Sequence, residues 1–176
     1  MVSEDPTQKD SAREAPSQQE SPQETWGSGG AASGTKAPAG LQQDPWLGTV
    51  ASWDDAEADR QIRGGLPIGI ATHLQSLLDL TDEEAAHLIG RSRSTYARYR
   101  NDERPLGTAE AERAVRFAQL LALAAETFGS LEEAKGWMKE ENYSLGGEKP
   151  FEMAETDPGA RVVRDLLYGL QYGHPA

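Results

Sequence analysis

Five arginines lie close together in the middle of the chain: Arg91, Arg93, Arg98, Arg100 and Arg104. Guanidinium groups bind phosphates and the edges of guanine bases, so this cluster indicates nucleic acid as a partner. The whole chain carries a net charge of −12, which argues against a protein that coats nucleic acid or anionic membrane through bulk attraction. We therefore expect any binding to DNA to depend on this local cluster.

The residue types that catalysis needs are scattered. The three histidines, His73, His87 and His174, are far apart in the sequence, and there is no cysteine. No glycine-rich phosphate loop follows a strand, and the carboxylates are spread along expected helix faces and the tail rather than paired. Without cysteine, neither a disulfide framework nor a zinc knuckle is available. We expect no enzyme, no metal site and no cofactor.

The first 64 residues have the composition of a disordered acidic tail or linker. Residues 1–45 contain almost no Val, Ile, Leu or Phe, too little apolar surface to offset the entropy lost on folding. Residues 46–64 are transitional, with Trp46 and Trp53 followed by a charged run. The N-terminus does not resemble a signal peptide, and no run reaches the roughly 18–20 apolar residues that span a bilayer. We expect a soluble, cytoplasmic protein.

From Leu66 onward the sequence has the periodicity of helices throughout, and we expect an all-α fold. An opening helix is predicted over 67–79. Thr81 and Glu84 then form a capping box, Gly90 suits the left-handed end of a short helix, and Ser92 is a good cap for the next one. Two short helices around a glycine turn, the second carrying the arginines, predict a helix-turn-helix.

In that arrangement Tyr96 and Tyr99 face inward. The outward face of the second helix lies near its N-terminal end, which is the end that enters a major groove. Arginine at that end can bind guanine edges, while Arg100 and Arg104 are placed to meet phosphates. The alternative is that the arginines only solvate an exposed helix face. The expected DNA-binding residues are Ser92, Arg93, Ser94, Arg98, Arg100 and Arg104.

The rest of the chain predicts one long helix and a small terminal module. Residues 108–128 are apolar nearly all round in their second half, which indicates either a central core helix or a dimer interface. Ser130 and Glu133 form a second capping box before a helix that carries Trp137. After a sharp reversal at a glycine pair, a final helix begins near residue 157 with an apolar face from Val162 to Leu170, and it stops at residue 173.

Several ordered motifs over residues 66–173 carry a family resemblance. These are "LTDEEAAHLIGRSRSTYARYR", "ERAVRFAQLLALAAETFGSLEEAKGWM", "ENYSLGGEKP", "TDPGARVVRDLL" and a closing Tyr-Gly. The first motif resembles the Xre-type helix-turn-helix of the Xre/MbcA/ParS antitoxins, and the second resembles the long helix that joins the two parts of these proteins. The last three resemble their C-terminal toxin-binding domain. Antitoxins of this family are partners of RES-domain toxins. Four positions depart from the family pattern. Arg91 follows the turn glycine where an apolar residue is usual, and Tyr143 replaces the usual proline of the loop. Glu148 stands where a basic residue is common, and Gly169 falls where the last helix often has arginine.

The resemblance implies an Xre-like helix-turn-helix domain over 65–127 and a toxin-binding domain over 128–176. It implies an antitoxin that neutralises a NAD-degrading RES toxin and that, as a homodimer or in complex, represses its own operon at operator DNA. The alternative is a stand-alone repressor whose C-terminal module only dimerises it. Tyrosine and arginine are common interface anchors, although Tyr168 and Tyr172 could instead cover the domain's own core. The expected toxin-binding residues are Gly146, Gly147, Pro150, Arg161, Arg164, Tyr168 and Tyr172.

Overall fold

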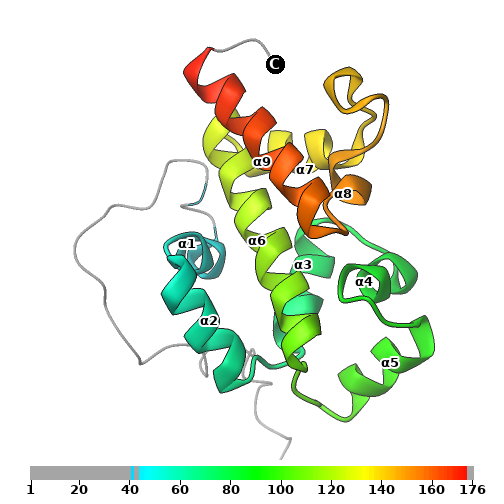
Figure 1. The fold of residues 1–176 in the computed structure, drawn as a ribbon. Helices are drawn as coiled ribbons and strands as arrows, with labels where there is room; N and C mark the ends of the chain where they lie inside the picture. Colours follow the sequence, from blue (N-terminus) through cyan, green and yellow to red (C-terminus); the bar gives the residue numbers. More distant parts are fainter. Residues whose placement is uncertain (1–40, 42–43, 174–176) are drawn as a thin grey trace, which may run out of the picture. The chain divides into compact units, whose positions relative to one another are not determined.

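The computed structural model describes Leu41 and residues 44–173. Within this part of the chain every regular element is a helix and no strand occurs, which confirms the all-α prediction (Figure 1). The elements are α1 (Pro45–Ala51), α2 (Asp55–Gly64), α3 (Gly69–Leu77), α4 (Asp82–Leu88), α5 (Arg93–Asn101), α6 (Thr108–Phe128), α7 (Leu131–Lys139), the 3₁₀ turn η3 (Tyr143–Leu145), α8 (Pro150–Met153) and α9 (Asp157–Tyr172). The expectations for residues 1–40 and for His174 lie outside the described residues.

The long helix α6 is the centre around which the other helices pack. It contacts α1 and α2 on one side and α3 and α4 on the other, and both α7 and α9 also pack against it (Figure 1). Phe117, Leu121 and Ala125 on this helix have no exposed surface. The nearly all-round apolar pattern of α6 is therefore explained by packing within one chain, and that pattern alone does not require a dimer interface.

Helices α1 and α2 lie where the composition predicted a disordered tail, and for residues 45–64 that prediction is wrong. Leu47 and Val50 are fully buried, and α1 packs on α6. Asp44 caps α1 by accepting the Leu47 N–H at 2.8 Å, and it also accepts from His73 Nε2 on α3 at 2.7 Å. The Trp46 ring stands edge-on to His73. Helix α1 has only seven residues, so its few apolar residues hardly alter the polar composition of the segment. Those residues are nevertheless enough to pack α1 against α6.

Helices α4 and α5 have the geometry that the turn and cap residues predict. The Thr81 N–H donates to Glu84 Oε2 at 2.8 Å, and the Glu84 N–H donates to Thr81 Oγ1 at 3.2 Å, so the capping box is confirmed. Gly90 follows α4 with φ of 70°, the left-handed conformation that glycine adopts at low cost. The Arg91 N–H then donates to the Ala86 carbonyl at 2.8 Å and closes the end of α4.

The C-terminal module is joined to α6 by close contacts at the start of α9. Thr156 caps α9 by accepting the Gly159 N–H at 3.2 Å. A Cβ atom at Gly159 would lie 1.9 Å from the Met153 carbonyl oxygen, so only glycine permits this approach of α9 to α8. Arg116 of α6, largely buried, donates to the Glu155 carbonyl at 3.3 Å and forms an ion pair with Asp157. The predicted capping box at α7 is half present, since Ser130 Oγ accepts the Glu133 N–H.

Candidate functional site

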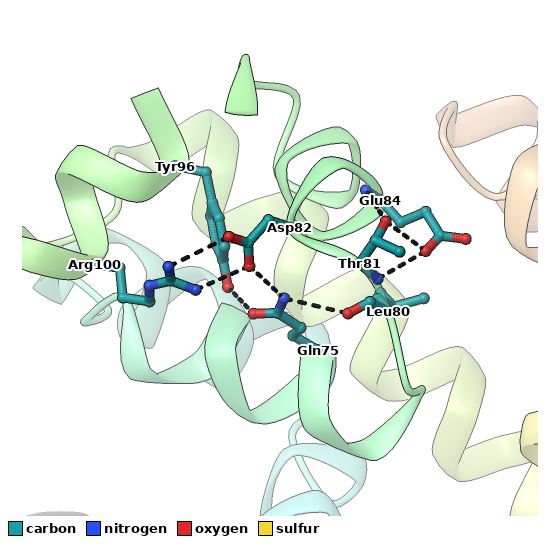
Figure 2. Close-up of polar contacts among 7 residues, drawn as sticks. All are labelled: Gln75, Leu80, Thr81, Asp82, Glu84, Tyr96 and Arg100. Atoms are coloured by element: carbon teal, nitrogen blue, oxygen red, sulfur yellow. Dashed lines mark hydrogen bonds and ion pairs between the residues drawn. The ribbon is translucent and has the colours of Figure 1, made fainter. Parts of the chain in front are cut away.

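A polar network fixes α5 against α3 and α4. The Tyr96 phenol donates to Gln75 Oε1 at 2.7 Å. The amide nitrogen of Gln75 donates to Asp82 Oδ1 at 2.9 Å and to the Leu80 carbonyl at 3.2 Å. Asp82 also accepts a two-pronged contact from the Arg100 guanidinium, at 2.9 and 3.3 Å (Figure 2). The helix that bears the arginines is therefore held in place by side chains of both neighbouring helices.

The charge states of this network are suited to its hydrogen bonds. Burial raises the pKa of the Tyr96 phenol to about 12, so it remains a donor. The hydrogen bond from Gln75, followed by that from Arg100, lowers the pKa of Asp82 and keeps it an acceptor. The Arg100 guanidinium also lies 5.7 Å from the centre of the Tyr96 ring. Tyr96 therefore remains a donor and Asp82 an acceptor across the physiological pH range.

Three of the five clustered arginines are engaged within the chain. Arg100, predicted to meet phosphate, is bound to Asp82 and is about half exposed. Arg91 forms an ion pair with Glu110 of α6, whose side chain is only 3% exposed. This pairing explains how a charged residue is accommodated in the turn, where an apolar one is usual. Arg104 lies over the Tyr99 ring, 5.1 Å from its centre.

The remaining predicted DNA-binding residues lie at the start and on the outer face of α5. Arg93 and Arg98 are exposed, and neither forms an ion pair with any residue that the structure describes. Ser92 caps the helix by accepting the Thr95 N–H at 3.3 Å, so its side chain has a structural task. Ser94 is exposed beside it. Tyr96 and Tyr99 face inward as expected, and both are buried.

A second surface lies in the C-terminal module. Within the described residues, every large hydrophobic side chain that is classed as exposed belongs to residues 143–172. Val162 and Leu170 were predicted on the apolar face of α9. Both are about half exposed, because Val162 lies at the edge of that face and Leu170 lies in the last turns of the helix. Val163, Leu166 and Leu167 form the face that is buried. The exposed set is Tyr143 (99%), Val162 (48%), Tyr168 (44%), Leu170 (50%) and Tyr172 (73%).

The outer face of α9 gathers most of the side chains predicted to bind a partner. Arg161, Tyr168 and Tyr172 recur at helical spacing on the exposed side, and Arg164 is half-buried at its edge. Tyr172 is 73% exposed, so it does not serve to cover the core. Tyr168 is partly covered and partly available. Aromatic and arginine side chains on one rigid helix can bind another protein surface.

The predicted glycines and proline shape the loop before α9. Gly146 and Gly147 have φ of 72° and 89°, which side chains rarely adopt, and both are exposed. Pro150 is buried in the first turn of α8. These residues therefore set the path of the loop.

Four residues of the two surfaces were not predicted as site residues from the sequence: Tyr143, Gln75, Asp82 and Glu110. Gln75, Asp82 and Glu110 could not be found from spacing, because the side chains that they contact are distant in sequence.

The histidines and carboxylates of the described residues form no group of three or more that is suited to hold a metal ion. His87 is exposed and lies 3.8 Å from Glu155, while His73 contacts Asp44. Likewise, none of the helices in this part of the chain is long and apolar enough to cross a membrane.

Comparisons with known proteins match the two segments of the chain that carry these surfaces. Residues 57–119 match the antitoxin Xre-like helix-turn-helix domain, which contains α3, α4 and α5. Residues 123–173 match the antitoxin Xre/MbcA/ParS C-terminal toxin-binding domain, which contains α7, α8 and α9. The chain is also similar to a protein of Photorhabdus laumondii subsp. laumondii named Antitoxin Xre, with 26% identity over 110 residues, 62% of this chain and 74% of that protein.

Proposed function

Because the chain belongs to the Xre/MbcA/ParS antitoxins, with a helix-turn-helix and a toxin-binding domain, we propose that it neutralises a NAD-degrading RES-domain toxin by binding it directly. The observation that carries this proposal is the position of the exposed tyrosines and apolar side chains, all within the domain whose family binds toxins. The resemblance of the sequence motifs supports the RES class of the toxin. The protein acts in the cytoplasm as a binding protein rather than as an enzyme.

The outer face of α9 is the central part of the proposed toxin contact. Arg161 and Tyr172 project from a helix whose opposite face is anchored on α6, so the backbone that carries them is fixed before binding. A fixed backbone loses less conformational entropy on association than a mobile one. Arg164 and Tyr168 flank them and extend the same face.

We propose that the helix-turn-helix represses the chain's own operon. Arg93 and Arg98 are the exposed arginines of α5 that form no ion pair within the described residues, so they are available to bases and phosphates. A net charge of −12 opposes DNA binding, so operator affinity would depend on these two arginines and on two copies binding together. Homodimerisation is therefore part of this proposal.

The test is co-expression with the protein encoded beside this chain, with growth and cellular NAD followed over time. The full chain should preserve NAD, and a variant carrying Arg161→Ala, Tyr168→Ala and Tyr172→Ala should lose that protection while staying folded. A variant carrying Arg93→Ala and Arg98→Ala is the matched control, and it should protect as well as the parent. If the neighbouring protein alone never lowers NAD, the proposal fails and the stand-alone repressor takes its place. If the α9 variant protects as fully as the parent, neutralisation stands but the outer face of α9 is not the toxin contact.

A further inference from the structure

Among the exposed large hydrophobic side chains in the described part of the molecule, Tyr143 has the highest exposed fraction. Its exposed fraction is 99%, so the ring makes almost no contact with its own chain. A surface tyrosine ordinarily lays its ring along neighbouring apolar groups. Here the ring does not, and it is carried on the short 3₁₀ turn η3.

The loop that carries Tyr143 is closed by its own hydrogen bonds. The Asn142 N–H donates to the Glu148 carbonyl at 3.1 Å, and the Gly147 N–H donates back to the Asn142 carbonyl at 2.9 Å. The Asn142 side chain accepts the Ser144 N–H at 2.9 Å and so caps the turn. These bonds on both sides of Tyr143 hold the backbone in a single conformation.

The loop is also fastened to the body of the module. Leu145, two residues after Tyr143, is only 5% exposed and belongs to the hydrophobic core. The turn η3 contacts α9, so the loop and the outer face of α9 belong to one surface. The exposed ring is therefore held outward by a rigid support.

The base of the loop is acidic. Glu140, Glu141 and Glu148 are all exposed, and the bond between Asn142 and Glu148 places the two ends of the loop side by side. The nearby Lys149 donates to Glu152 at 3.2 Å, so its charge is partly neutralised. A partner surface that accepts this loop should be apolar at its centre and basic at its rim.

We propose that Tyr143 is an anchor that the loop 142–148 inserts into a basic-rimmed pocket of the toxin. The inference rests on the proposed function and adds an anchor outside the α9 face. A ring carried on a backbone that is already fixed needs no loop ordering on association and gains its full apolar burial there. The carboxylates at the base of the loop add attraction to the basic rim and guide the orientation of the encounter.

The experiment measures the dissociation constant of the purified full chain for the protein encoded beside it, by titration calorimetry at low and high salt. Tyr143→Ala should weaken binding by about tenfold or more, as expected for an anchor residue. Tyr143→Phe keeps the ring and should stay within about threefold. Ser76→Ala, at an exposed position of α3 outside both proposed surfaces, is the matched control and should bind like the parent. Glu148→Gln should weaken binding more at low salt than at high salt.

Two further variants test the rigid support. Asn142→Ala removes the cap and should weaken binding although the ring remains, while Asn142→Asp keeps the acceptor and should restore most of it. If the parent binds and Tyr143→Ala binds equally well, the anchor is refuted and the proposed function stands. If the parent does not bind the neighbouring protein at all, the proposed function and the anchor both fail. Unfolding midpoints of all variants should match the parent except for Asn142→Ala, because a 99% exposed ring contributes little to stability.

Discussion

Gly159 has no side chain, and this permits the start of α9 to lie directly against the end of α8. The Met153 carbonyl oxygen occupies the space where a Cβ atom would stand, and Thr156 caps the helix by accepting the Gly159 N–H. The motif Thr-x-x-Gly therefore has a physical meaning: the threonine begins α9, and the glycine lets it begin directly against the previous turn.

We expect Gly159→Ala to lower the free energy of unfolding by about 1–3 kcal/mol or more, because backbone atoms must move to admit the methyl group. Gly136→Ala is the control, since a Cβ there meets nothing within 4 Å. That variant should stabilise the interior of α7 by about 0.5–1 kcal/mol. Urea unfolding of the three proteins measures both effects, and equal midpoints for parent and Gly159→Ala would show that the junction is loose.

Asp44 gives a prediction that depends on pH. Burial alone would raise the pKa of Asp44, but the hydrogen bonds from His73 and the Leu47 amide outweigh burial, and the pKa is lowered from its ordinary value of 3.8. The folded state therefore binds this proton more weakly than the unfolded chain. The stabilisation of the folded state by the Asp44 carboxylate is therefore fully present above the pKa of the unfolded chain. It is lost as the pH falls through the lowered pKa of Asp44 in the folded protein.

Asp44→Asn should accordingly cost about 1 kcal/mol at pH 5, and its difference from the parent should shrink towards pH 3. Unfolding by urea at a series of pH values measures the two curves. A difference that stays constant down to pH 3 would mean that the Asp44 charge contributes nothing to α1 docking.

At the scale of the elements, sequence predicted the long helices better than the contacts between them. Residues 108–128 were predicted as a helix and α6 has those bounds, because a long periodic pattern leaves little ambiguity. The two ion pairs that fix the arginines were missed, since Arg91–Glu110 and Arg100–Asp82 join residues 19 and 18 positions apart. Such pairs depend on how α4, α5 and α6 cross, which helical periodicity does not specify.

The short elements were missed for a different reason. Helices α1 and α8, with seven and four residues, are too short to show a clear period. Their helical state depends on tertiary packing rather than on propensity. The exposure of Tyr143 could not be predicted either, because it depends on the hydrogen bonds that close its loop.

The arginines of α5 give a prediction at this scale for operator DNA. Arg93→Ala and Arg98→Ala should each weaken binding and reduce the slope of log affinity against log salt by about 1 where the residue meets a phosphate. Arg100→Ala should act in part through stability, since it leaves Asp82 without its guanidinium partner. Fluorescence anisotropy with upstream DNA at several salt concentrations measures the affinity and its salt dependence. An unchanged slope for Arg93→Ala and Arg98→Ala would favour the alternative that these arginines only solvate an exposed helix face.

At the scale of the whole molecule, α6 belongs to both functional halves. The matched domains meet at residues 119–123, within α6, and α1 and α9 pack on the same helix. The described residues should therefore unfold together rather than in two separate steps.

Leu47→Ala tests this cooperativity from the far end of the fold. Leu47 is fully buried, and its truncation should cost about 2–5 kcal/mol. Because α1 shares its support with α9, tryptophan fluorescence and far-UV circular dichroism should report one common, lowered midpoint. A second transition that keeps the parent midpoint would show that the toxin-binding domain is stable without α1.

The most direct test of the central claim is oxidative footprinting of the five tyrosines, with and without the protein encoded beside this chain. Tyr96 and Tyr99 of α5 are buried and should label slowly in both states. We predict that labelling of Tyr168 and Tyr172 falls several-fold in the complex, together with that of Tyr143. If a complex forms and the labelling of Tyr168 and Tyr172 is unchanged, the toxin does not bind the outer face of α9, and the proposed contact is wrong.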